Sequence, residues 1–155
     1  MSEAEFRTRI AIGVIHDPEE AQRLIAEFGS RRDAIPALAV VASKRHLGRY
    51  ANCLKADRET GYNPPPVMVH RTNGDFDAAT WRPDALDEGR FRRQLLAFEQ
   101  WMAPMLVARL KAHLDQRALI LAIPIYSADQ EQTVCRMLLK WAVDYLYVQD
   151  VPKVN

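Results

Sequence analysis

Hydrophobic residues along the chain fall into short runs typical of strands and into spaced stripes typical of helices. The longest run without a charge covers residues 118–126, Ala-Leu-Ile-Leu-Ala-Ile-Pro-Ile-Tyr. It is too short to cross a membrane and is typical of a strand covered on both faces. The run therefore predicts a central strand of a sheet, in which pairing ends near Ile123 because Pro124 has no N–H to donate.

The N-terminal part of the chain predicts a strand, a helix and a second strand. Large and small residues alternate over residues 9–15, and a second short apolar run covers residues 37–42. Between them, Asp17 is suited to cap a helix whose first position is Pro18. Gly13 would allow a helix to approach the first strand closely.

The C-terminal part repeats this order of elements. The strand at residues 118–123 is followed by a capping segment at residues 127–131 and then by another strand at residues 145–148. The helix between the two strands has an apolar stripe formed by Val134, Met137, Leu138 and Trp141. Two β-α-β halves predict an α/β (α+β) protein with a ferredoxin-like sheet of four strands and helices on one face.

An insertion separates the two halves. Apolar residues at helical spacing predict a short amphipathic helix over residues 47–54, and the three prolines at residues 64–66 cannot continue a helix. Residues 67–81 predict a hairpin, because Asn73-Gly74 is the strongest short turn signal. Such a hairpin could extend the main sheet or stand apart as a flap.

The longest helical pattern covers residues 84–115. Pro104 lies inside it and predicts a kink or two abutting helices. The apolar stripe from Phe91 to Leu114 is wider than one sheet face requires, and Tyr145 and Tyr147 alternate along a predicted edge strand. These two surfaces predict a homodimer.

Length and composition favour one domain, residues 1–155, in which residues 9–43, 44–116 and 117–149 are the first half, the insertion and the second half. The 21 Lys and Arg residues nearly balance the 20 Asp and Glu residues, so a nucleic-acid partner is not favoured. The N-terminal residues do not resemble a signal peptide, and no apolar run is long enough for a membrane span. We expect a cytoplasmic protein without membrane contact, in which Cys53 and Cys135 are reduced thiols.

A basic segment directly after the second predicted strand is the best candidate for a ligand site. Several cations at the end of a strand suit a phosphate or a carboxylate, although a solvated helix face would have the same composition. The predicted ligand-binding residues are Lys44, Arg45, His46 and Arg49.

Two histidines are candidates for acid–base catalysis. His16 follows a strand and precedes a capped helix, and His70 lies in the predicted hairpin. The neighbouring Asp17 has a sufficient structural reason to be aspartate as an N-cap. The histidines and cysteines lack metal-ligand spacing and the familiar nucleotide and nucleophile motifs are absent, so we expect no metal and no cofactor.

Three functions fit these observations. The first is a non-catalytic homo-oligomeric module that binds a small ligand or a protein partner. The second is a small enzyme that acts on a phosphorylated or carboxylated metabolite. The third is a nucleic-acid binder that uses residues 44–58. Convergence of His16, His46 and His70 on one site would favour the enzyme.

Overall fold

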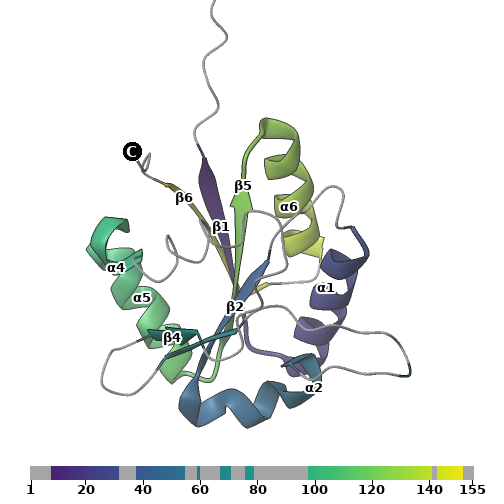
Figure 1. Ribbon diagram of the computed structural model, residues 1–155, viewed down its shortest axis with the longest axis vertical. Helices are drawn as coiled ribbons and strands as arrows, with labels where there is room; N and C mark the ends of the chain where they lie inside the picture. The colour runs from purple at the N-terminus through teal and green to yellow at the C-terminus, as the bar shows by residue number, and fades with distance from the viewer. Residues whose placement is uncertain are drawn as a thin grey trace, which may run out of the picture.

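The computed structural model describes residues 8–31, 38–54, 59, 67–70, 76–78, 98–140 and 143–151. Its centre is a six-stranded sheet of order β4-β3-β2-β5-β1-β6 (Figure 1). The strands are β1 Arg9–Ile15, β2 Ala39–Ser43, β3 Val67–His70, β4 Phe76–Ala78, β5 Leu119–Ile125 and β6 Tyr145–Asp150. The helices are α1 Pro18–Ser30, the 3₁₀ helix η1 Lys44–Tyr50, α2 Ala51–Leu54, α4 Phe98–Trp101, α5 Pro104–Asp115 and α6 Ala128–Lys140.

Strands β2, β5, β1 and β6 form the predicted ferredoxin-like sheet. Strand β1 is antiparallel to both β5 and β6, and β2 is antiparallel to β5. The two β-α-β halves therefore interleave, with β5 between β1 and β2. This arrangement confirms the fold class expected from the sequence.

Helices cover both faces of the sheet. Helices α1 and α6 lie on one face, as predicted, while α5 lies on the opposite face (Figure 1). The expectation of helices on one face alone is therefore incomplete. The cause is in the strands, because every residue of β5 is buried and both of its faces need apolar cover.

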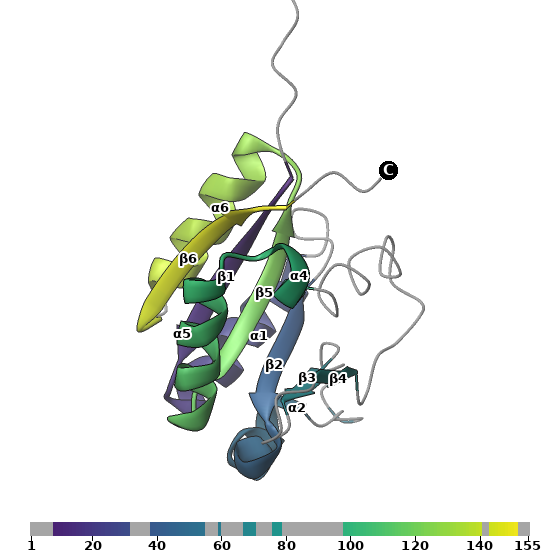
Figure 2. The same ribbon diagram turned by 90° about the vertical axis from the view of Figure 1, so that its left-hand side faces the viewer.

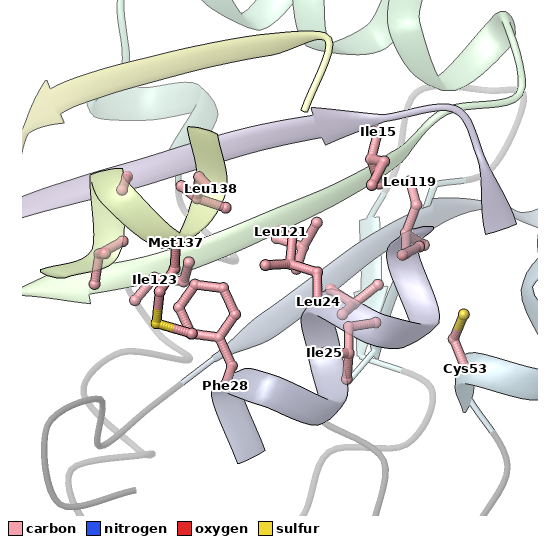
Figure 3. Close-up of a cluster of buried hydrophobic side chains, with 14 of the residues drawn as sticks. Ile15, Leu24, Ile25, Phe28, Cys53, Leu119, Leu121, Ile123, Met137 and Leu138 are labelled. Carbon is pink, nitrogen blue, oxygen red and sulfur yellow. The ribbon is translucent and has the colours of Figure 1, made fainter. Parts of the chain in front are cut away.

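The larger of the two cores lies between the sheet and helices α1 and α6. Figure 3 shows side chains of α1 and α6 meeting those of β5. Gly13 of β1 permits the close approach expected from the sequence, since a Cβ atom there would lie 2.9 Å from Cδ2 of Leu138. The labelled side chains of this core include Leu24, Ile25, Phe28, Leu121, Ile123, Met137 and Leu138.

Pro124 lies inside β5, where the pairing is one-sided. The β2 neighbour ends opposite Ala122, but β1 stays paired with β5 as far as Ile125. The prediction that pairing ends near Ile123 is therefore wrong for the β1 side. Proline is tolerated here because, among the described residues, β5 has only the β1 neighbour at this point and behaves locally as an edge strand.

The predicted hairpin is part of the main sheet. Strands β3 and β4 pair antiparallel, and β3 lies parallel to β2, so the hairpin extends the sheet at the edge away from β6 (Figure 2). The predicted turn at Asn73-Gly74 lies outside the described residues.

The long helical pattern contains two abutting helices where it is described. Helix α4 ends at Trp101 and α5 begins at Pro104, so the proline occupies a first helical turn, where its missing N–H causes no loss. The predicted part before Phe98 lies outside the described residues. Within the described ranges, no helix is both long enough and apolar enough to cross a bilayer.

Candidate functional site

The end of β1 holds a histidine in a fixed orientation. His16 follows β1, and Asp144 directly precedes the neighbouring strand β6. One carboxylate oxygen of Asp144 lies 2.6 Å from His16 Nδ1 and accepts from the His16 backbone N–H at 3.0 Å. The Asp144 backbone N–H in turn donates to the Val14 carbonyl oxygen at 2.8 Å. A neutral His16 ring that donates from Nδ1 keeps Nε2 as an acceptor.

A second histidine, which the sequence did not single out, lies beside His16. His113 of α5 is buried, and its ring meets that of His16 edge to face with centroids 6.2 Å apart. Its Nε2 lies 3.3 Å from the Tyr147 hydroxyl oxygen, and its ring contacts that of Tyr145 at a centroid distance of 4.5 Å. The buried Nδ1 of His113 has no hydrogen-bond partner in the part of the chain that is described.

The surroundings of His113 favour its neutral form. Burial lowers the pKa of His113 most strongly, and the nearby charge of His16 lowers it further. The Asp144 carboxylate acts in the opposite direction, while Arg109 adds to the lowering. His113 is therefore a ring whose surroundings favour the neutral form, packed beside the more exposed pair of His16 and Asp144.

Two residues at the end of η1 bring the basic segment to His16. The Arg49 guanidinium donates from Nη2 to the His16 carbonyl oxygen at 3.0 Å. The next residue, Tyr50, is fully buried, and its hydroxyl donates to the Arg117 carbonyl oxygen in the connection between α5 and β5. Burial is the main cause that raises the pKa of Tyr50, so the hydroxyl stays protonated and able to donate. Together these contacts fix η1 against the end of β1.

The predicted ligand-binding residues share one short element but differ in what they contact. The short helix predicted over residues 47–54 begins earlier than expected, as a 3₁₀ turn at Lys44 that Ser43 caps by accepting from the Arg45 N–H at 3.3 Å. Lys44 and Arg45 are exposed, and His46 is half-buried. Arg49 is the member of the set that the structure shows in contact with His16. Anion binding by this segment stays a prediction.

Whether His16, His46 and His70 converge on one site stays untested, because the side chain of His70 lies outside the described residues. His70 ends β3 in register beside Ser43, which places its backbone at the end of β2 where η1 begins. The histidine that the structure places beside His16 is His113. Asp17 serves as the N-cap predicted for α1, because its side chain accepts from the Glu19 N–H at 2.9 Å.

The order of the strands could have indicated that Asp144 lies beside His16. In a ferredoxin-like sheet the first and last strands are antiparallel neighbours, so the residue after one strand lies beside the residue before the other. The helical pattern could likewise have indicated that His113 is buried against the sheet, because it lies between Leu110 and Leu114 of an apolar stripe. Both signals become usable only after the strands and the helix have been placed together.

The described residues contain no group of three or more His, Cys, Asp or Glu side chains able to hold a metal ion. Burial raises the pKa of the Cys53 thiol to about 11, and it also raises the pKa of Cys135. Neither thiol is activated as a nucleophile.

Comparison of the chain with protein-family models, with curated proteins and with solved structures gives no match. The cluster at the end of β1 is therefore the basis on which a function can be argued.

Proposed function

We propose that the protein binds a small carboxylated or phosphorylated metabolite at the end of the sheet where η1 meets His16. The observation that carries the proposal is the 3.0 Å hydrogen bond from Arg49 to the His16 carbonyl oxygen, which fastens the basic segment to the backbone of the residue whose imidazole contacts Asp144. Guanidinium groups bind carboxylates and phosphates through paired hydrogen bonds, and one contact to a carbonyl leaves other N–H groups of Arg49 able to donate.

The local charge supports an anionic ligand. Lys44 and Arg45 are exposed on the same short helix as Arg49, and His16 adds a positive charge when it is protonated. Asp144 and Asp17 are opposing charges, but Asp144 already accepts two hydrogen bonds from His16 and Asp17 accepts one from the Glu19 N–H. The ligand anion is therefore expected on the Arg49 side of His16.

A thermal-shift titration tests this proposal. Inorganic phosphate and citrate, added at fixed ionic strength, should stabilise the protein by about 2.7 kcal/mol at a hundredfold excess over the dissociation constant. A variant with Lys44, Arg45 and Arg49 each changed to Gln should lose this gain, while its unliganded stability falls only by the one hydrogen bond that Arg49 donates, because the removed charges are exposed. The matched control removes the same charge from other elements, at Arg23, Arg136 and Lys140.

The comparison between the two triple variants decides the outcome. Loss of stabilisation in the η1 variant alone places the anion site at η1. Equal responses of both variants and the wild type would refute an anion site there and favour the interpretation of the segment as a solvated helix face.

The second candidate function is acid–base catalysis on the same metabolite, and the 2.6 Å contact between His16 and Asp144 favours it. An oriented imidazole whose Nε2 accepts a proton is the usual general base at neutral pH. His70, the other candidate from the sequence, remains a prediction. Hydrolysis of p-nitrophenyl phosphate by the wild type, lost in His16→Gln while phosphate binding persists, would support catalysis. A wild type without turnover would favour simple binding.

A further inference from the structure

We infer that the ligand carries a planar aromatic ring next to its anionic group, as a nucleotide does, and that this ring stacks on Tyr145. The inference rests on the proposed anion site and adds the class of molecule that this site accepts. It depends on a group of aromatic side chains next to His16 that the anion site alone does not explain.

Tyr145 presents an exposed ring that is held in place. Tyr145 is 49% exposed and is one of the exposed large hydrophobic residues in the described part of the chain. Tyr145 and Tyr147 lie on one face of β6, and their rings are nearly parallel, with an interplanar angle of 7° and centroids 6.3 Å apart. A fixed and accessible aromatic face is what stacking of a nucleobase requires.

His113 acts as a positioning residue for this pair. Its ring contacts the Tyr145 ring at a tilt of 38°, and its Nε2 lies 3.3 Å from the Tyr147 hydroxyl. A phenylalanine could fill the same buried space without leaving Nδ1 unpartnered, so packing alone does not explain a histidine. The contact to Tyr147 does explain it, because the His113 Nε2 gives the Tyr147 hydroxyl a polar partner that phenylalanine lacks.

The aromatic group continues directly into the anion site. The His113 ring contacts Tyr145 on one side and lies 6.2 Å from the His16 ring on the other. The backbone carbonyl oxygen of His16 in turn accepts the hydrogen bond from Arg49. The stacking surface and the cationic group are thus linked through the His113 ring and through the ring and backbone of His16, an arrangement that suits a ligand with a ring and a phosphate. Because Asp144 repels an anion beside Tyr145, the phosphate belongs at the Arg49 end.

Isothermal titration of the full chain with AMP, adenosine and inorganic phosphate at one salt concentration tests the inference. AMP should bind at least tenfold more tightly than phosphate. Tyr145→Leu should reduce AMP affinity to the level of phosphate without changing phosphate affinity, and Tyr145→Phe should keep the advantage of AMP because it keeps the ring. Val148→Ala, an exposed apolar position on the same strand, is the matched control and should leave all affinities unchanged.

The possible results separate the two proposals. Equal affinities for AMP and phosphate would overturn the aromatic inference and leave the anion site intact. Absence of binding by both would overturn the anion site as well. An oligoadenylate that binds far more tightly than AMP and loses affinity steeply with salt would overturn the small ligand in favour of single-stranded nucleic acid.

Discussion

Replacing Leu121 with alanine should remove a large part of the stability of the fold. Leu121 is fully buried at the middle of β5, where it is opposite Gly13 on one side and Val40 on the other. Its side chain contributes to the core that α1 and α6 cover (Figure 3). Loss of three carbon atoms costs about 2.4 kcal/mol at about 0.8 kcal/mol for each buried carbon. The cavity raises this cost toward about 5 kcal/mol, because two helices and two paired strands hold its walls.

Urea unfolding followed by tryptophan fluorescence measures this cost as a change in the free energy of unfolding. The matched control is Leu139→Ala on α6, a position that is 65% exposed and should change stability by less than about 0.5 kcal/mol. A loss below about 1 kcal/mol for Leu121→Ala would show that β5 is not the central strand between the two helical layers.

Three further predictions concern a loop, a titration and an edge. Arg117 has a positive φ of 72°, a backbone conformation that costs a non-glycine residue about 1–2 kcal/mol. Arg117→Gly should therefore raise the melting temperature. An unchanged or lower melting temperature would contradict backbone strain at Arg117. The pKa of His113 is lowered in the folded state, so the unfolded chain binds more protons and the free energy of unfolding should fall as the pH drops below about 6.5. Urea titrations of His113→Gln at several pH values should show a weaker pH dependence of this free energy. The same pH dependence in the variant and the wild type would refute a role of His113. The outer edge of β6 has no neighbouring strand in the described sheet, so we propose that two copies of the chain form a dimer through this edge. Light scattering should then report twice the chain mass of 17.7 kDa. A monomer at micromolar concentration would exclude the dimer.

The local elements could be predicted from the sequence because their signals are local. Alternation over residues 9–15, the cap at Asp17 and the proline at residue 104 each act within a few residues of the chain. These signals were enough to give both β-α-β halves and, from them, the fold class. The sequence did not predict that α5 covers the second face of the sheet, because an apolar stripe on a helix does not identify the surface against which the helix packs.

The candidate site was only half predictable for the same reason. His16 and Arg49 were singled out, since each follows a strand or lies in a basic run. Asp144 and His113 were missed, because each is important through a contact with His16 that is distant in the sequence. Asp144 lies 128 residues from His16, and His113 comes from helix α5. Such contacts depend on strand order and helix docking, which neither composition nor periodicity contains.

The strand order also governs how this chain can be made. Strand β1 leaves the ribosome well before both of its neighbours in the sheet, β5 and β6. During synthesis β1 therefore has no neighbouring strand of the described sheet until residues near Ile125 have emerged. Closing so long a loop before β1 gains either of its neighbouring strands slows folding. We expect the nascent chain to stay open to chaperones and proteases until β5 emerges, and to fold only when β5 and β6 are both available.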